Sequence, residues 1–227
     1  MTVYTFAFLR CPTTAFTLPI GIHSSVEVTC VGDVAAITES NISIDALQAN
    51  DNNLMQAILA HDRVLRAIFE QTVILPLRFG TCFVTGDRLI EHLQNHSSTY
   101  LKSLDNLSGK AEYMLKAIPL ELETQPIGVE KKGKAYLLEK KKQYQAQSSY
   151  QQQQRDELDD LLNLIDQAYH YVFAPNDDSD IKKINILHSR NEEDSLLQTY
   201  LQWRDRYQAW DLHLSEALPP YHFISGI

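Results

Sequence analysis

The chain has 227 residues, enough for one large domain or two small ones. Hydrophobic residues make up 44% of the sequence, close to the globular average, so we expect a folded core rather than general disorder. Twenty Lys and Arg against 29 Asp and Glu leave a formal net charge of −9. That balance argues against anionic partners such as nucleic acid or acidic lipid headgroups.

The three cysteines, Cys11, Cys30 and Cys82, are widely spaced and include no Cys-x-x-Cys pair. Reduced thiols in a cytosolic compartment are therefore the simplest expectation. The first ten residues lack the basic start of a secretory signal, and no stretch approaches the ~20 apolar residues that span a bilayer. We therefore expect a soluble intracellular protein.

Residues 1–108 alternate between strand-like and helix-like periodicity, which predicts an N-terminal α+β domain. In chain order its predicted elements are a strand at Val3–Leu9, a hairpin of Val26–Val31 and Val34–Thr38, a helix at Leu54–Phe69, a strand at Thr72–Phe79 and a helix at Arg88–Leu107. Asn52 or Asn53 would cap the first helix and Asp87 the second. Pro76 would place its strand at a sheet edge or create a bulge, because proline cannot donate a ladder hydrogen bond.

Residues 109–217 predict a second α+β domain. Its expected elements are a strand at Lys110–Ile118, a long helix over about Gly133–Tyr171, a strand at Lys182–His188, a helix at Asp194–Tyr207 and a strand at Ala209–Ala217. This order is typical of a modified ferredoxin-like fold with a helical extension. In the first of these strands, alternation would bury Tyr113 and Leu115 and turn Glu112 and Lys116 to solvent.

The long helix is polar at its start, with three lysines at Lys140–Lys142 and seven glutamines up to Gln154. Leu137, Tyr144, Leu158 and Ile165 lie on a heptad, but Gln151 occupies the missing step, so a coiled-coil seam fails in the first half. The favoured interpretation is a helix that is solvated at first and docked later. The alternative is a protruding helix pair that grips a partner.

Candidate chemical sites are incomplete. His92 and His96 lie four residues apart on a predicted helix, but two imidazoles alone do not make a metal site. The acidic run of Asp177, Asp178 and Asp180 lacks the ligand ladder and glycine of a calcium loop. The sequence contains no Gly-x-Ser-x-Gly elbow and no glycine-rich phosphate loop. We therefore expect no catalytic residue, no metal and no cofactor.

The segment His61-Asp62-Arg63 resembles an acid/base cluster only on paper, because consecutive helical residues point about 100° apart. His61 lies on the apolar stripe and is expected to be a buried, hydrogen-bonded histidine. Arg63 and Arg66 would pair with Asp62, Glu70 or a strand-end carbonyl, and Arg78 with a buried carboxylate. A structural role is favoured for all of them.

The last ten residues, 218–227, form an apolar tail that holds Pro219, Pro220, Tyr221 and Phe223. Two prolines prevent it from continuing a helix or a central strand. An exposed tail of this kind would favour aggregation, so we expect it to pack in a crevice between the two domains.

Several segments, in this order, resemble the F/L family of gas vesicle proteins, minor proteins made alongside the buoyancy organelles of aquatic bacteria and archaea. The segments are Tyr4–Leu9, Ala60–Arg66, Leu75–Gly80, Gly109–Glu112, Gly133–Leu137 and Pro219–Phe223. The resemblance covers nearly the whole chain, and the apparent completeness of the chain and its tail favour the F type over the sister L type.

The resemblance implies two α+β domains with the tail between them. It also implies residues that are structural or partner-binding rather than catalytic: His61, Arg63, Arg66, Pro76, Arg78, Phe79, Gly80, Pro219, Pro220, Tyr221 and Phe223. The expected location is the gas vesicle within the cytoplasm, on the gas-facing side of the shell.

The function implied is that of a minor component and assembly factor that binds the hydrophobic main shell protein, and possible further partners are other minor gas vesicle proteins. It would prevent aggregation of shell protein during nucleation. Contact could run through an edge strand, Val3–Leu9 or Thr72–Phe79, or through an apolar groove beside the long helix. The alternatives are a passive wall component and a small-ligand-binding or catalytic ferredoxin-like protein.

Overall fold

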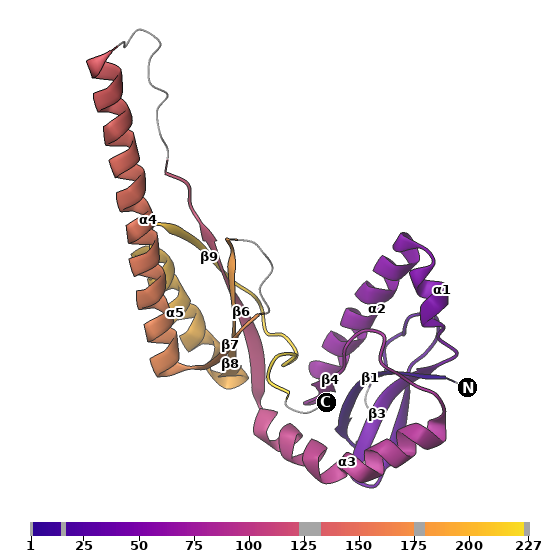
Figure 1. Ribbon diagram of the computed structural model, residues 1–227. Helices are drawn as coiled ribbons and strands as arrows, with labels where there is room; N and C mark the ends of the chain where they lie inside the picture. The colour runs from indigo at the N-terminus through magenta and orange to yellow at the C-terminus, as the bar shows by residue number, and fades with distance from the viewer. Residues whose placement is uncertain (1, 15–16, 123–132, 175–179, 225–227) are drawn as a thin grey trace. The chain divides into compact units, whose positions relative to one another are not determined.

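The computed structural model describes residues 2–14, 17–122, 133–174 and 180–224. By the contacts within it, the chain divides into two compact units. Unit 1 combines Met1–Glu112 with Ala217–Ile227, and unit 2 is Tyr113–Glu216. Each unit contains one β-sheet with helices packed on it (Figure 1). No helix in the described ranges combines the length and the hydropathy of a membrane-spanning segment.

The sheet of unit 1 has the strand order β2-β3-β1-β4, and β5 also pairs with β1. Its strands are β1 (Val3–Arg10), β2 (Glu27–Val31), β3 (Val34–Ser40), β4 (Leu75–Pro76) and β5 (Cys82–Phe83), all paired antiparallel. β1 is therefore an internal strand, and the expectation that Val3–Leu9 offers a free edge is wrong. Pro76 does lie in the edge strand, which keeps only two residues of the predicted Thr72–Phe79.

Three helices complete the part of unit 1 that is described: α1 (Ile44–Gln48), α2 (Asp51–Phe69) and α3 (Gly86–Leu107). α2 begins earlier than predicted, because the Asn50 side chain accepts the N–H groups of Asn52 and Asn53. Thr85, rather than Asp87, caps α3 by accepting from Arg88 N–H. α3 is one continuous helix that runs through the polar pair Ser97 and Ser98.

β1 is buried on both faces, because α2 and α3 lie on opposite sides of the sheet (Figure 1). Its Phe6 ring stacks on His61 of α2, with 5.3 Å between ring centroids. Its Phe8 ring stacks on Tyr100 of α3 at 4.7 Å. The register against β3 shifts between Thr5 and Ala7, and such a bulge changes which side of the sheet the following side chains face. One strand thereby serves both halves of the core.

The sheet of unit 2 has the order β7-β8-β6-β9. Its elements are β6 (Lys110–Pro119, whose first three residues belong to unit 1), α4 (Lys134–Ala168), β7 (His170–Phe173), β8 (Lys182–Ser189), α5 (Glu193–Arg206) and β9 (Trp210–Leu214). β7 was not predicted, and its start was assigned to the long helix, because four residues directly after a helix carry little periodicity. The element order suits the expected ferredoxin-like fold, and that assignment remains an interpretation.

The two halves of α4 have different surroundings. Leu161 and Ile165 in the second half are buried, whereas Leu137 and Tyr144 in the first half are 65% and 75% exposed. Hydrogen bonds hold the second half from Gln154 onward: the Trp210 indole N–H donates to the Gln154 carbonyl at 2.9 Å. The first half projects past the sheet of its own unit (Figure 1).

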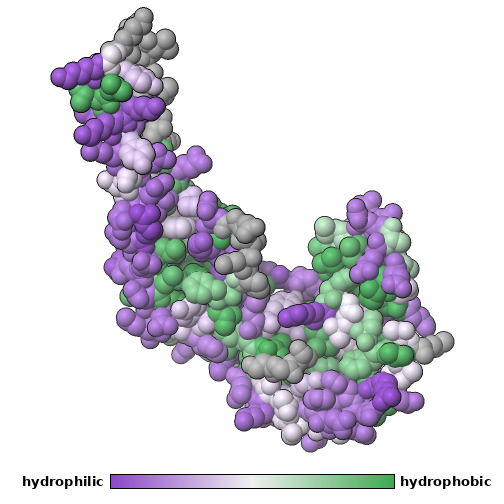
Figure 2. Space-filling view, viewed as in Figure 1, coloured by the Kyte–Doolittle hydropathy of each residue, from purple (hydrophilic) through white to green (hydrophobic). Residues whose placement is uncertain are grey.

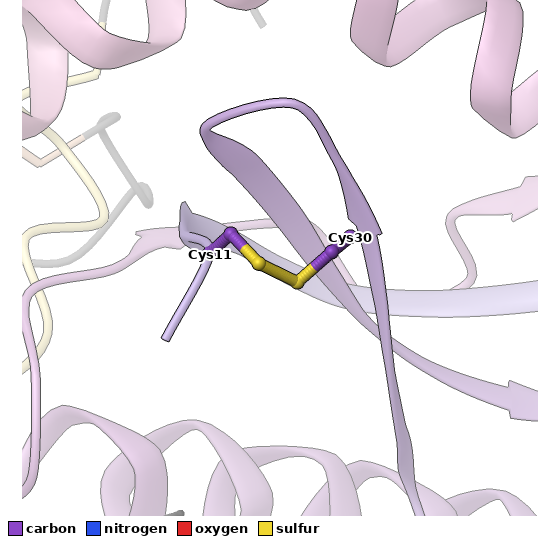
Figure 3. Close-up of a disulfide and its surroundings, with 2 residues drawn as sticks. All are labelled: Cys11 and Cys30. Carbon is purple, nitrogen blue, oxygen red and sulfur yellow. A yellow bond between two sulfur atoms is a disulfide. The ribbon is translucent and has the colours of Figure 1, made fainter. Parts of the chain in front are cut away.

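Cys11 and Cys30 form a disulfide, with their Cα atoms 5.5 Å apart (Figure 3). The expectation of three reduced thiols is therefore wrong, and Cys82 alone is free and half-buried. The pairing could not be predicted from local sequence spacing, because the two cysteines are 19 residues apart. They meet only because β3 pairs with β1 on one side and with β2 on the other.

The disulfide predicts one reactive thiol, that of Cys82, in protein that is purified without reductant and then unfolded. Replacing Cys30 by Ser should lower the free energy of unfolding by about 3 kcal/mol, since the closed loop restricts the unfolded chain. Cys82→Ser is the matched control and should leave stability nearly unchanged. Three reactive thiols in the unfolded wild type would contradict the pairing.

Candidate functional site

The residues of the gas-vesicle-like motifs meet in unit 1 around α2. At the centre lies His61, which is 5% exposed. Its Nε2 lies 3.1 Å from the Leu77 carbonyl oxygen, and its Nδ1 lies 2.8 Å from the Tyr4 hydroxyl. The Tyr4 hydroxyl in turn accepts the Gly80 N–H at 3.2 Å. The network joins α2, β1 and the segment that follows β4.

These partners fix the tautomer of His61. A carbonyl oxygen can only accept, so Nε2 carries the proton and Nδ1 accepts from the Tyr4 hydroxyl. Burial lowers the pKa of His61, which keeps the ring neutral. Burial also raises the pKa of Tyr4, so its phenol stays a donor. The Phe79 ring packs edge-on to His61, with 5.7 Å between centroids.

Arg63, the second residue after His61, holds the loop before β2. Its guanidinium donates to the carbonyl oxygens of Ile20 at 3.2 Å and Gly21 at 3.1 Å. The predicted partners of Arg63 were Asp62, Glu70 or a strand-end carbonyl, and it donates instead to two loop carbonyls. The side chain therefore anchors a loop.

Glu39, which was not predicted as a functional residue, binds the same loop. The residue is fully buried, and its carboxylate accepts the N–H groups of Ile22, His23 and Ser24 at 2.6 to 2.8 Å. A β-carbon at Gly21 would overlap this carboxylate, so the loop needs glycine there. The available signal was a carboxylate near the end of a strand, β3, that begins with four apolar residues.

Asp62, between His61 and Arg63, contacts the C-terminal tail. Its Oδ1 accepts the Tyr221 hydroxyl at 3.0 Å, and its Oδ2 accepts the Arg66 guanidinium at 2.7 Å. Burial, and then the nearby Asp62 charge, raise the pKa of Tyr221, which therefore remains a neutral donor. Arg66 thus pairs with Asp62 as predicted.

A second contact fixes the tail to the start of β6. Glu112 and Leu218 exchange backbone hydrogen bonds of 3.0 and 2.8 Å. The Glu112 carboxylate accepts the His222 N–H at 2.9 Å and lies 2.7 Å from the His222 Nδ1. The predicted exposure of Glu112 is wrong: its side chain is 2% exposed because the tail covers it. Burial raises the pKa of Glu112, while the His222 contacts lower it.

The remaining motif residues have structural positions. Pro219 and Pro220 are buried, and Phe223 is half-buried. Gly80 has a φ of 89°, a conformation that favours glycine. Arg78 is exposed and forms no ion pair with any described residue, so the expected pairing with a buried carboxylate is wrong; its carbonyl accepts from Thr81. Whether the tail also lies in a crevice between two domains remains a prediction.

The histidine pair of α3 makes a ring stack. The His92 and His96 centroids lie 4.3 Å apart, and the His92 Nε2 lies 2.6 Å from the Tyr100 hydroxyl. Burial, and then the neighbouring His96, lower the pKa of His92. Among the described residues, no group of three or more His, Cys, Asp or Glu side chains could hold a metal ion. Asp177 and Asp178 lie outside the described residues.

The three consecutive residues of the His61 segment point in different directions. His61, Asp62 and Arg63 point to the core, the tail and a loop, as their 100° spacing requires. Two grooves of about 470 and 410 Å³ are lined by other residues, the larger beside α4 and the smaller at the β2–β3 turn. A catalytic or ligand-binding role would need the motif side chains to converge, and these three do not.

Because His61 is buried and neutral, we expect the protein to become less stable as the pH is lowered. The unfolded chain binds a proton as pH drops through about 6.5, whereas the folded chain resists it, so the free energy of unfolding should decrease between about pH 7 and 5. His61→Gln should flatten this dependence. His23→Gln, at an exposed side chain, is the control. An equal pH slope in wild type and His61→Gln, measured by urea unfolding, would contradict the assignment.

The tail contacts predict that removing residues 219–227 lowers the melting temperature. His222→Ala should cost about 2 kcal/mol, because it leaves the buried Glu112 carboxylate short of a partner. Tyr221→Phe should cost no more than about 1 kcal/mol, because Asp62 is half-exposed and keeps Arg66. Tyr144→Phe, at an exposed ring, serves as control. Unchanged melting and protease sensitivity after the deletion would refute the tail's role.

Comparisons with known proteins bear on the family and the fold of this chain. The family model described as "Gas vesicle synthesis protein GvpL/GvpF" matches residues 2–225. The fold is similar to the crystal structure of gas vesicle protein GvpF from Microcystis aeruginosa, with 14% identity, 98% of each chain covered and a TM-score of 0.71. It is also similar to GvpF from Anabaena sp. PCC7120, with 17% identity, 99% of each chain covered and a TM-score of 0.66.

No curated protein matches the sequence. Because the sequence identities to the two crystal structures are low, these similarities show the fold alone. The family model, by contrast, matches nearly the whole chain. The chain belongs to the GvpL/GvpF family of gas vesicle synthesis proteins.

Proposed function

We propose that this chain is a minor gas vesicle component and an assembly factor, which binds the hydrophobic main shell protein and prevents its aggregation during nucleation. The observation that carries the proposal is the match of a gas vesicle synthesis family over residues 2–225. Family membership supports a role in making the gas vesicle, and the partner is inferred from the physical problem that such assembly poses.

A shell that excludes water needs a strongly apolar building block. Such a protein associates without direction, because apolar burial depends on area rather than orientation. A companion with a net charge of −9 can cover apolar surface transiently and keep the complex dispersed by mutual repulsion. Ordered polymerisation then displaces it.

The surface of α2 that faces away from the core suits this contact. Met55, Ile58 and Leu59 lie three and four residues apart and are exposed, while the opposite face of α2 is buried. Ile20, exposed on the loop that Arg63 holds, adds to the apolar side chains of unit 1. Figure 2 shows hydrophobic residues gathered over α2.

Other routes have less support. β1 is paired on both sides, and β4 offers only two residues for strand addition. The groove of about 470 Å³ beside α4 is lined largely by polar side chains, among them Gln147, Gln151 and Gln154. The α2 surface is therefore the favoured contact.

The proposed location is the gas vesicle within the cytoplasm. A protein that binds shell subunits at nucleation would be enclosed as the shell grows around the nucleus. The gas-facing side of the shell follows from this order of events.

Co-expression with the main shell protein tests the proposal. The wild type should raise the soluble fraction of shell protein and be recovered with it in a pull-down. Met55→Gln with Leu59→Gln removes side chains that are 57% and 54% exposed, and should weaken binding by about 2 kcal/mol, roughly 30-fold in Kd.

The matched control is Leu197→Gln with Leu201→Gln, an equally spaced pair on α5 that is 47% and 37% exposed. This variant should raise the soluble fraction of shell protein and bind it as the wild type does. No rise in soluble shell protein and no complex with the wild type would refute the proposal. Co-purification without a rise in solubility would indicate a passive wall component instead.

A further inference from the structure

The exposed side of α4 is polarised along its length. At 100° per residue, Lys134, Lys141, Gln145, Asp159 and Asp166 share one side of the helix. This set, here called the α4 stripe, is exposed along its length. Lys134–Tyr144 contains four Lys and one Glu, whereas Arg155–Ala168 contains five Asp and Glu and one Arg. One helix thus carries a basic end and an acidic end.

The charged residues of the α4 stripe lack ion-pair partners within the part of the chain that the structure describes. No described residue forms an ion pair with Lys134, Lys141, Asp159 or Asp166. By contrast Asp160, on a different side of α4, accepts the Tyr207 hydroxyl at 2.8 Å and the Arg206 guanidinium at 2.6 Å. The Asp160 carboxylate therefore joins α4 to the rest of unit 2, whereas the α4 stripe is exposed to solvent. Figure 2 shows the outer surface of α4 as largely hydrophilic.

The stripe is complementary to itself. Lys134 and Asp166 lie at equal distances in sequence on either side of Tyr150, and so do Lys141 and Asp159. A second α4 laid antiparallel, with a twofold axis beside residue 150, therefore places each Lys opposite an Asp of the partner. The symmetry repeats both pairs, giving four ion pairs along about 50 Å of helix.

We propose that two copies of this chain associate through antiparallel α4 stripes, with the basic end of each on the acidic end of the other. The interaction is isologous, because each copy gives and receives the same contacts. Exposed ion pairs are individually weak, so the dimer is a reversible one that depends on concentration. This inference is independent of the shell-protein contact, which involves α2 in unit 1.

Net charge makes the test specific. Two copies that each carry −9 repel one another, and salt screens that repulsion. An interface without charge complementarity would therefore strengthen as salt is added. The α4 stripe predicts the reverse: dimer at about 50 mM salt and monomer at about 500 mM. Sedimentation velocity over a series of protein concentrations measures both states.

Charge reversal identifies the contact. Lys134→Glu with Lys141→Glu, and separately Asp159→Lys with Asp166→Lys, should each weaken self-association at low salt at least about tenfold. An equimolar mixture of the two variants should restore the dimer, because the reversed charges complement one another. Lys102→Glu with Lys140→Glu changes net charge equally at exposed positions off the stripe and should still dimerise.

Each remaining outcome overturns the proposal. The proposal is wrong if the wild-type protein stays monomeric at every concentration in low salt. Self-association retained by both stripe variants, or a mixture that stays monomeric, would exclude this pairing. Circular dichroism and melting of each variant establish that α4 remains folded, so that loss of the dimer reports on charge rather than unfolding.

Discussion

The hydrogen bonds of His61 join three segments that are far apart in the sequence. The imidazole donates to the Leu77 carbonyl and accepts from the Tyr4 hydroxyl, which in turn accepts from Gly80. A buried polar ring is tolerated only when both nitrogens have partners, and here each partner belongs to a different element. The strand β1, the segment after β4 and the helix α2 are thereby fixed to one another at a single point.

The same helix then distributes its next two side chains. Asp62 receives Tyr221 of the tail, and Arg63 holds the loop at Ile20 and Gly21. Because α2 is fixed on its inner side, its outer side presents Met55 and Leu59 on a rigid support. Preorganised apolar side chains lose less conformational entropy on binding than mobile ones. This is the physical link between the motif residues and the proposed contact with shell protein.

Periodicity predicted most of the regular elements. The strand at Val3–Leu9, the hairpin around Gly32 and the main helices follow from alternation, turn chemistry and apolar spacing, with boundaries shifted where Asn50 and Thr85 act as caps. The role of His61 followed from its place on the apolar stripe of a helix. The local sequence pattern was sufficient wherever the burial of a residue depended on a single face of its own helix or strand.

Long-range contacts were not predictable in this way. Glu112 alternates to the side expected to face solvent, but the tail returns and covers it. Cys11 and Cys30 meet only through the pairing of three strands. Glu39 is buried because a loop with Gly21 folds over its carboxylate. Each outcome depends on a partner segment that no local pattern specifies.

The protonation state of His61 tests the central claim most directly. A long-range ¹H–¹⁵N correlation spectrum of the imidazole distinguishes the two neutral tautomers and the charged ring. The account predicts the neutral Nε2–H tautomer at pH 7 and a pKa below the ordinary histidine value, because burial disfavours the charged ring. An Nδ1–H tautomer, or a ring that is protonated near pH 7, would contradict it.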